Sequence, residues 1–564
     1  MEVTIDEERR RFLFKPGPDI GAHTVLLKLP SRRWMAASQT FVVPWTRLNA
    51  LRLQEASSQL SLDRPVQSKL EELTARKGNG DKFPDWYAYK TRPMPQQIEA
   101  AHHAFATGTA ALFMDMGTGK TKSAIDTLVA AFYAHKISAV VVVCPLTVSS
   151  VWKNEMATHC PCPHVVTYVR SNTPLHKIAL SQDKLNVLVV GVESLSQGKA
   201  GENLLGFVRA HRPAMVVDES SDIKNHATIR TRAVIEMGKH APMKMILSGT
   251  PVIKNIIDLY AQFEFLDPNI IGVGDYYAFR NRYCIMGGYK RKEIVGYDNI
   301  DELMGLINPY IYSCTKEQVM AYLPPKTYTV RTIQMSEAQK EAYTKIKKNK
   351  MEKVDVKNTL TKALRLQQVV GGYLGTGKKE DDNYFMEDTR ELVELVPPEK
   401  NPKIAELVRI AEQDNRQMIV WARYKAEVEA ITKMLRPLGR VVNMVGGMSI
   451  DEKEEVQRAF QAGEAKFFVG TQQAGGIGIT LTAAHTVVYY SNTNSYRDRI
   501  QSEDRAHRKG LVHGVLYIDL LMDKTVDIGI ITSIHEKRDL ADYVADRLAQ
   551  RQSVDKILEG DDNE

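Results

Sequence analysis

The stretch FMDMGTGKTKSAID, residues 113–126, follows an apolar run and leads into a segment with the spacing of an amphipathic helix. Gly117 and Gly119 leave room for backbone N–H groups to converge on phosphate oxygens. Lys120 can neutralise β- and γ-phosphates, and the Thr121 hydroxyl can bind Mg²⁺ at the start of the helix. The stretch therefore predicts a site for ATP and Mg²⁺ between a strand and a helix.

Met114 occupies the first loop position, where the usual pattern G-x-x-x-x-G-K-[ST] has glycine. A side chain is tolerated there if the turn forms without positive φ, because the position lies where the chain leaves its strand. The alternative is a chance G-T-G-K-T at a helix start. The strand–loop–helix context argues against chance, so we expect a working nucleotide site.

Short β-rich apolar runs alternate with helical segments in two parts of the chain. Between about residues 108 and 250 the runs are AALFMDM, SAVVVVCP, NVLVVGVE, AMVVDES and MKMILSGT; from about residue 417 they are QMIVWA, KFFVGTQ, TVVYYS and GVLYIDLL. Continuous Val/Ile/Leu strands alternating with helices are typical of parallel sheets covered on both faces. The sequence predicts an α/β fold with two lobes of similar size.

The rest of the chain differs from these lobes in composition. The lysine-dense span after the first lobe is helix-rich, and the N-terminal part has two strand-like runs followed by a helix, which predicts a small α+β appendage. We divide the chain into an N-terminal accessory domain (1–85), an ATP-binding lobe (90–268), a helical insertion and linker (269–400), a second lobe (401–550) and an acidic tail (551–564).

Composition sets broad limits on class and location. With 564 residues, 43% of them hydrophobic, the chain is expected to form two to four globular domains. A net charge of +7 mildly favours a polyanionic partner, and five cysteines do not make a disulfide framework. No apolar run approaches the about 18 residues of a membrane helix, and no secretory signal is visible. We expect no membrane association and a cytoplasmic protein of a bacterium or a phage-infected cell, with the nucleus as an alternative.

The segment VVDESSDIKN places two acidic residues at the end of an apolar strand, about one hundred residues after the phosphate loop. Asp218 can hold Mg²⁺ through water, and Glu219 can orient and deprotonate the attacking water. Two acids after a strand are also common as helix caps. In combination with the phosphate loop, however, they indicate catalysis.

The segment QSEDRAHRKG places Arg505 and Arg508 three residues apart, which predicts one helix face. Arginine can form two hydrogen bonds with γ-phosphate oxygens and stabilise charge that develops during transfer. The alternative is a pair of surface salt bridges with Glu503 and Asp504. If the base lies in one lobe and the arginines in the other, hydrolysis requires closure of the lobes and is coupled to motion.

These motifs together resemble the superfamily 2 helicases, and specifically the Swi/Snf-type DNA translocases, from about residue 90 to 545. The resemblance implies two RecA-like lobes. RPMPQQ resembles the adenine-reading segment, with Gln97 as the base contact and Arg92 as a helper, and MGTGKT is the phosphate loop. The nucleotide residues implied by the match are Arg92, Gln97, Met116, Gly117, Thr118, Gly119, Lys120, Thr121 and Asp218, with Gly476 and Gly478 from QAGGIGITLTAAHTVVYY in the second lobe.

The resemblance also implies contacts with the DNA backbone. VVCPLTVSSVWKNEM, DESSDIKN and LSGTPVIKN resemble the first-lobe segments that touch DNA or link it to hydrolysis. The expected DNA-binding residues are Pro145, Thr147, Ser194 and Lys224 in the first lobe and Tyr424 and Gln472 in the second. Such contacts with phosphates carry no sequence information.

Two of the departures from the family pattern bear on function, and the N-terminal segment suggests a second resemblance. Ser221 stands where the family commonly has histidine, which affects communication with the SGTP segment, and Thr480 stands where asparagine is usual. LPSRRWM…FVVPW resembles the HARP-type domain of annealing helicases. Arg32, Arg33 and Trp34 would then bind a DNA junction by charge and stacking, whereas the alternative is a small packing domain with an exposed basic turn.

The resulting hypothesis is an ATP-driven translocase on double-stranded or branched DNA, acting as a monomer with unknown protein partners, with annealing or fork remodelling as a finer function. One alternative is a helicase that separates strands. Another, from a different class, is a nucleotide-gated DNA-binding scaffold with slow turnover. DNA-stimulated ATP hydrolysis distinguishes these readings.

Overall fold

The structure is a computed structural model of the chain. It divides the protein into two compact units, residues 1–319 and 320–539. The residues that the structure describes are 2–16, 20–29, 32–74, 80–170, 173–175, 178, 180–196, 200–252, 255–288, 293–348, 359–375, 392–474 and 479–538. The acidic tail 551–564 lies outside them. All five cysteines are buried and free.

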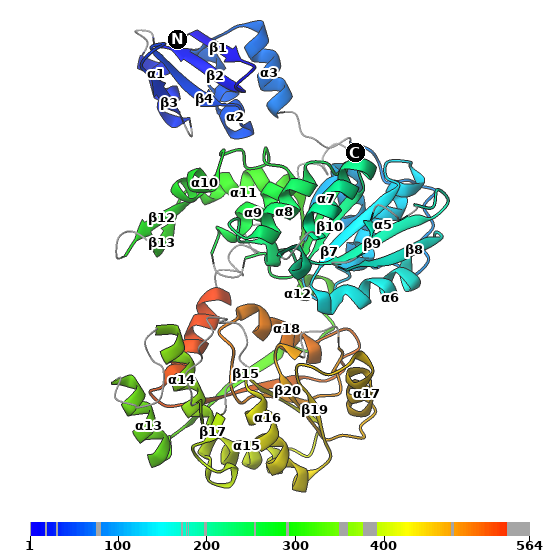
Figure 1. Ribbon diagram of the computed structural model, residues 1–564, viewed down its shortest axis with the longest axis vertical. Helices are drawn as coiled ribbons and strands as arrows, with labels where there is room; N and C mark the ends of the chain where they lie inside the picture. Colours follow the sequence, from blue (N-terminus) through cyan, green and yellow to red (C-terminus); the bar gives the residue numbers. More distant parts are fainter. Residues whose placement is uncertain are drawn as a thin grey trace. The chain divides into compact units, whose positions relative to one another are not determined.

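The first unit begins with a small α+β module, drawn in dark blue in Figure 1. Five strands form one sheet in the order β3-β4-β2-β1-β5. Phe12, Phe14 and Leu53 belong to its buried core. The elements are β1 (Glu2–Asp6), β2 (Arg11–Lys15), α1 (Ile20–Lys28), β3 (Arg33–Met35), β4 (Thr40–Pro44), α2 (Arg47–Glu55), β5 (Ser61–Leu62) and α3 (Arg64–Thr74).

The N-terminal module contacts the rest of the first unit through α2. Leu48 is buried within the core of the larger lobe. The Arg47 guanidinium lies 5.8 Å from the centre of the Tyr310 ring. Arg52 forms an ion pair with Glu302, which also pairs with Arg282. Apolar packing and a shared carboxylate therefore attach the module to the lobe.

Seven parallel strands form the large sheet of the first unit, in the order β14-β6-β11-β10-β7-β9-β8. They are β6 (Thr109–Met114), β7 (Ala139–Cys144), β8 (His164–Val169), β9 (Leu185–Gly191), β10 (Ala214–Asp218), β11 (Lys244–Ser248) and β14 (Ile311–Cys314). The helices of the lobe include α4 (Pro95–Thr107), α5 (Lys120–Tyr133), α6 (Ser149–His159), α7 (Ala200–His211), α8 (Ile229–Gly238) and α9 (Asp258–Leu266). The prediction of a parallel α/β lobe is confirmed.

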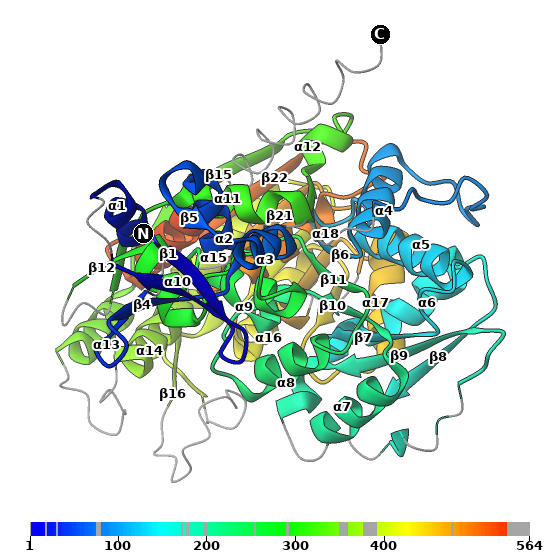
Figure 2. The same ribbon diagram turned by 90° about the horizontal axis from the view of Figure 1, so that it is seen from above.

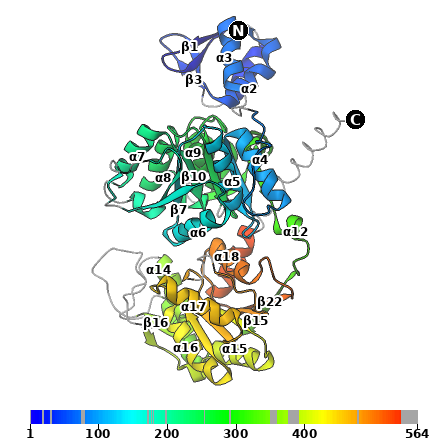
Figure 3. The same ribbon diagram turned by 90° about the vertical axis from the view of Figure 1, so that its right-hand side faces the viewer.

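Each face of this sheet has its own hydrophobic core, because successive strand residues point to opposite sides. Val141 and Val143 belong to the core that includes residues of α7, α8 and α9. Val140 and Val142 belong to the core that includes residues of α4, α5 and α6. Figure 2 and Figure 3 show α7 and α8 on one side of β10 and α5 on the other. The continuous valine runs of the sequence are thus strands buried on both faces.

The second unit contains a six-stranded parallel sheet in the order β15-β22-β21-β18-β20-β19. The strands are β15 (Lys326–Ile333), β18 (Met418–Ala422), β19 (Val441–Met444), β20 (Phe467–Thr471), β21 (Thr486–Tyr489) and β22 (Val515–Met522). Its helices include α15 (Pro402–Gln413), α16 (Lys425–Leu435), α17 (Ile450–Gln461) and α18 (Tyr496–Ala506). The second α/β lobe is therefore confirmed as well.

The span 269–400, predicted as a helical insertion and linker, supplies one edge strand to each large sheet. β14 pairs with β6 in the first unit, and β15 pairs with β22 in the second. The other elements of the span are α10 (Tyr276–Tyr283), β12 (Cys284–Gly287), β13 (Glu293–Tyr297), α11 (Ile300–Ile307), α12 (Lys316–Val319), α13 (Glu337–Lys347), α14 (Thr359–Gly371), β16 (Tyr373–Gly375) and β17 (Leu392–Glu394). Within the described ranges, no helix has the length and apolar character needed to cross a membrane.

Candidate nucleotide and nucleic-acid sites

The phosphate loop connects β6 to α5 and has the backbone that its glycines predict. Gly117 and Gly119 have φ of 84° and 102°, the left-handed region that glycine adopts without strain. Met114 is fully buried and is not among the described residues with positive φ. The turn therefore accommodates methionine at its first position, as the sequence predicts. Lys120 Nζ donates to the carbonyl oxygens of Met114 and Asp115, at 2.6 and 3.1 Å, so its charge lies over the loop.

Gln97, the predicted base contact, lies directly against this loop. Its Oε1 accepts from the Met94 N–H at 3.0 Å, and its Nε2 donates to the Thr118 carbonyl at 3.3 Å. A Cβ placed on Gly119 would lie only 1.9 Å from Gln97 Nε2. Glycine at position 119 is therefore required by the close approach of Gln97 as well as by the backbone conformation of the loop. Arg92 is exposed in the segment before α4.

Asp218 and Glu219 lie at the end of β10 with distinct environments. Asp218 Oδ2 accepts from the Trp152 indole N–H at 2.8 Å. Burial and the neighbouring Glu219 charge raise the pKa of Asp218 to about 6, although the Trp152 hydrogen bond and the Lys120 charge oppose this shift. Glu219 has φ 51° and ψ 54°, a left-handed conformation that is costly for a residue with a side chain. Strain of this kind is typical of functional positions.

Strand order brings three predicted motifs together. β11 lies between β6 and β10, so the phosphate loop, the SGTP segment and the acidic pair follow the carboxyl ends of adjacent parallel strands. A Cβ on Gly249 would lie 3.2 Å from Met116 Cγ and 3.5 Å from Lys120 Nζ. The SGTP turn therefore packs against the phosphate loop. This is the edge at which open parallel sheets bind ligands.

The residues at this edge fit a divalent cation. Mg²⁺ in nucleotide sites usually has one or two carboxylate ligands together with phosphate oxygens and waters. Burial disfavours the charged form of Asp218, and a bound cation would offset that cost. Thr121, in the first turn of α5, supplies a hydroxyl. Thr121 and Asp218 are therefore the residues that would hold Mg²⁺.

The predicted DNA-binding residues of the first lobe follow the carboxyl ends of three neighbouring strands. Pro145 and Thr147 come after β7, with Thr147 in the short 3₁₀ helix Leu146–Val148. Ser194 lies after β9 and donates to the Gly191 carbonyl, and half-buried Lys224 follows the acidic motif. Parallel strands end at one edge, so these residues share the edge that carries the phosphate loop.

In the second unit, the predicted contacts Tyr424 and Gln472 are largely buried, at 8% and 1% exposed. Tyr424 follows β18 and caps α16. Gln472 follows β20; its Oε1 accepts from the Thr493 N–H at 2.9 Å, while its Nε2 has no hydrogen-bond partner among the described residues. Gly476 and Gly478 lie outside the described part of the chain.

The prediction that Arg505 and Arg508 share one helix face is wrong, because α18 ends at Ala506. Beyond this end, His507 Nε2 contacts the Pro324 carbonyl oxygen at 2.8 Å and the chain leaves the helical path. Arg505 is 4% exposed. Arg508 is half-buried and donates to the Thr480 hydroxyl at 3.2 Å. Thr480, which stands where the family usually has asparagine, thus contacts a predicted catalytic arginine.

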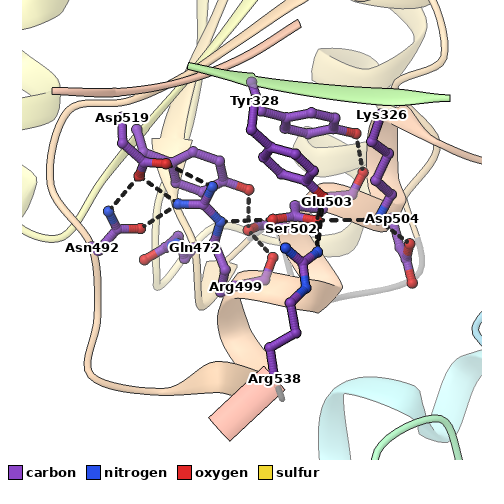
Figure 4. A network of polar contacts seen from close by, with 12 residues as sticks. Lys326, Tyr328, Gln472, Asn492, Arg499, Ser502, Glu503, Asp504, Asp519 and Arg538 are labelled. Atoms are coloured by element: carbon purple, nitrogen blue, oxygen red, sulfur yellow. Dashed lines mark hydrogen bonds and ion pairs between the residues drawn. The ribbon is translucent and has the colours of Figure 1, made fainter. Parts of the chain in front are cut away.

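Figure 4 shows a buried charge network on α18 that sequence reasoning did not find. Arg499 donates to both carboxylate oxygens of Asp519, at 2.6 and 2.9 Å, and to Glu503 at 2.8 Å. Glu503 also accepts from Tyr328 at 2.8 Å and pairs with Lys326 at 3.1 Å. The sequence signal for this network was the spacing of four residues between Arg499 and Glu503, which suits an ion pair along a helix. The network fixes the helix that leads to the two candidate arginines.

Glu503 should stabilise the second unit in a pH-dependent way. Burial alone would raise its pKa, but the charges of Lys326, Arg499 and Arg538 lower the pKa from 4.5 to about 2. A lowered folded-state pKa gives stability that is complete above the unfolded value and is lost as the pH falls from about 4.5 towards 2. Glu503→Gln should therefore lower the free energy of unfolding by about 3 kcal/mol at pH 7 and by less at pH 3.

Urea unfolding of the second unit at both pH values measures this difference. The control is Glu464→Gln, which removes an exposed carboxylate that pairs with Arg440 and Arg458. It should cause little change at either pH, because exposed pairs contribute little. An equal loss for Glu503→Gln at pH 7 and pH 3 would contradict the assigned pKa.

Comparison with known proteins identifies two families that match the chain. The family described as "SNF2-related domain" matches residues 64–375, and "Helicase conserved C-terminal domain" matches 399–510. The ISWI chromatin-remodeling complex ATPase CHR11 of Arabidopsis thaliana is 24% identical over 464 residues, which are 78% of this chain and 42% of that protein. The putative ATP-dependent helicase/translocase YwqA of Bacillus subtilis is 25% identical over 449 residues, 77% of this chain and 46% of that protein.

Among solved structures, a Sulfolobus solfataricus SWI2/SNF2 ATPase core in complex with dsDNA is 21% identical with a TM-score of 0.39, over 83% of this chain and 96% of that chain. The chain spans less than half of the length of the two curated relatives. The first family match, however, covers more than half of the chain, and the second adds the C-terminal lobe. The chain belongs to the SNF2-related family of Swi/Snf-type proteins and carries both parts of a helicase-type ATPase core.

Proposed function

We propose that the chain is a Mg²⁺-dependent ATPase that DNA stimulates and that moves along double-stranded DNA. One observation carries this proposal: Lys120, Asp218 and Gly249 meet where the phosphate loop, acidic pair and SGTP turn follow adjacent strands. Lys120 provides phosphate binding and Asp218 cation binding, and the neighbouring Glu219 adds a base at the same edge of the sheet. The names of the two curated relatives, an ATPase and a putative helicase/translocase, support the same activity.

Each residue of this edge has a specific role in the proposed reaction. Lys120 binds the β- and γ-phosphates, and the loop N–H groups orient them. Glu219 orients the attacking water and accepts its proton. Mg²⁺, when bound, neutralises charge on the phosphate oxygens. The left-handed backbone of Glu219 sets the direction in which its side chain leaves the main chain.

We also propose that Arg505 and Arg508 stabilise charge on the γ-phosphate during transfer. Arginine hydrogen bonds to phosphate oxygens suit this role. Because the two arginines belong to the second unit and the base to the first, hydrolysis would depend on both units. A requirement for both units is what couples ATP turnover to motion.

The proposed DNA contacts are with phosphates of one strand. The residues are Pro145, Thr147, Ser194 and Lys224 in the first unit and the turns at Tyr424 and Gln472 in the second, where both side chains are largely buried. The finer function, annealing or remodelling of forks and junctions, draws support from the N-terminal module. Arg33 and Trp34 are exposed on the edge strand β3, with Trp34 at 48% exposure. An exposed guanidinium and an exposed indole on one edge strand suit binding by charge and base stacking.

ATP turnover of the full chain on four DNA structures tests the proposal. We expect duplex DNA to raise turnover above the level reached with single strands of the same length, and forked or four-way DNA to do so at least as well. Because the contacts are with phosphates, the DNA concentration for half-maximal stimulation should rise steeply with salt.

Other results would overturn parts of this proposal. Stimulation by single strands but not by duplex would favour a strand-separating helicase. Turnover that stays near zero on every DNA would favour the nucleotide-gated scaffold.

A further inference from the structure

A fully buried glutamine in α9 lies beside the proposed catalytic edge. Gln262 is 0% exposed, and its helix neighbours Leu259, Phe263 and Leu266 belong to the apolar core of the lobe. Burying an amide among apolar side chains is unfavourable unless its hydrogen bonds are made. The position of Gln262 therefore raises the question of what its amide binds.

The Gln262 amide joins two of the motifs at the sheet edge. Its Oε1 accepts from the Ser220 hydroxyl at 2.6 Å. Its Nε2 donates to the Pro251 carbonyl at 2.8 Å and to the Asp258 carbonyl, within its own helix, at 2.7 Å. Ser220 belongs to the acidic motif and Pro251 to the SGTP segment. One side chain thus bridges the two loops.

The Ser220 end of this bridge lies next to the proposed base. Glu219 precedes Ser220 and holds the left-handed backbone that a residue with a side chain adopts only when its surroundings impose it. Ser220 is fully buried and begins the 3₁₀ turn Ser220–Ile223. The hydrogen bond from the Ser220 hydroxyl to Gln262 therefore restricts the backbone of the neighbouring Glu219.

Ser221, the position where the family commonly has histidine, does not make this link. Its hydroxyl is buried and has no hydrogen-bond partner in the described part of the chain. The preceding serine, Ser220, is the residue that is linked to the SGTP segment, through Gln262.

The Pro251 end of the bridge leads to the phosphate loop. The Thr250 N–H donates to the Ser248 hydroxyl at 3.0 Å, which shapes the turn before Pro251. Gly249, in the same turn, packs against Met116 and Lys120. If the SGTP turn moved, it would therefore affect Lys120, which it contacts. It would also affect Glu219, to which it is linked through Gln262.

We infer that Gln262 is a positioning residue that couples the SGTP turn to Glu219, so that DNA binding controls the placement of the base. The inference rests on the proposed function for its DNA dependence. The physical link between the two loops rests on the hydrogen bonds alone.

Three variants test the link: Gln262→Leu, Ser220→Ala and the double variant. The matched control is Gln339→Leu in the second unit. Gln339 is also 0% exposed, and its Nε2 donates to the Val369 and Val370 carbonyls, both at 3.1 Å. Leucine is similar in size at either site, so both changes remove a buried amide and its bonds to main-chain carbonyls.

We expect Gln262→Leu to reduce the ratio of DNA-stimulated to basal ATP turnover about tenfold, with the KM for ATP unchanged. Ser220→Ala should have a similar effect, and the double variant should be no worse than either single one, because both break one connection. Hydrogen exchange should rise together in residues 217–223 and 246–252. Gln339→Leu should leave the ratio and both segments unchanged.

Three results would overturn the inference: a stimulation ratio equal to wild type in Gln262→Leu, faster exchange in only one of the two segments, or additive losses in the double variant. A loss of basal and stimulated turnover in equal proportion would assign Gln262 a structural role only. If wild type shows no stimulation by DNA, the proposed function fails, and the exchange experiment still decides whether the two loops are linked.

Discussion

Glu219→Gln should hydrolyse ATP about a thousandfold more slowly than wild type while binding ATP and DNA with unchanged affinity. The amide has nearly the shape of the carboxylate but cannot accept a proton from water. A thousandfold loss corresponds to about 4 kcal/mol in the activation barrier. Steady-state turnover with saturating duplex DNA measures the rate, and titration with a fluorescent ATP analogue measures binding.

The matched control for this variant is Glu236→Gln. Glu236 lies on α8 of the same lobe, away from the sheet edge, and pairs with Lys239 at 2.7 Å. Its loss should leave turnover unchanged. Normal hydrolysis by Glu219→Gln would show that another group activates the water, and the assignment of the base would be abandoned.

Arg508→Lys should lower the DNA-stimulated turnover number about a thousandfold, with little change in ATP binding. Lysine keeps the positive charge but cannot form two parallel hydrogen bonds with phosphate oxygens. Arg508 is the better test of the two arginines, because Arg505 is only 4% exposed and its replacement would also disturb packing. Rapid-quench measurement of ATP cleavage under single-turnover conditions isolates the chemical step.

Arg409→Lys provides the control, since Arg409 is an exposed arginine of the same unit that pairs with Glu406. It should turn over at the wild-type rate. If Arg508→Lys also does so, hydrolysis does not require the second unit's arginine, and the proposed coupling between ATP turnover and motion would lose its basis.

The fold could be predicted because its signal is local. Runs such as AVVVVC are apolar at every position, as a strand buried on both faces requires, and the structure places Val140 and Val141 in opposite cores. The phosphate loop was equally visible, since Gly117 and Gly119 adopt the positive φ that the motif demands. At these positions the residue type alone meets the local requirement: valine suits burial on both faces of a sheet, and glycine suits a positive φ.

Other features depend on partners that are distant in sequence. β15 carries exposed and half-buried residues, so nothing in its own composition showed that it pairs with β22. The bridge from Ser220 to Gln262 spans 42 positions, and a glutamine within an apolar helix gives no hint of its partners. The end of α18 at Ala506 depends likewise on tertiary contacts, among them that of His507 with the Pro324 carbonyl.

The attachment of α2 has a practical consequence for dissecting the chain. Cutting away the first module would uncover the apolar surface that Leu48 covers and leave Glu302 with one guanidinium partner instead of two. A truncated protein would therefore have an altered first unit and would not simply be a shorter chain. Substitutions at Arg33 and Trp34 leave the contacts between α2 and the lobe intact. They are therefore the better test of what the module contributes.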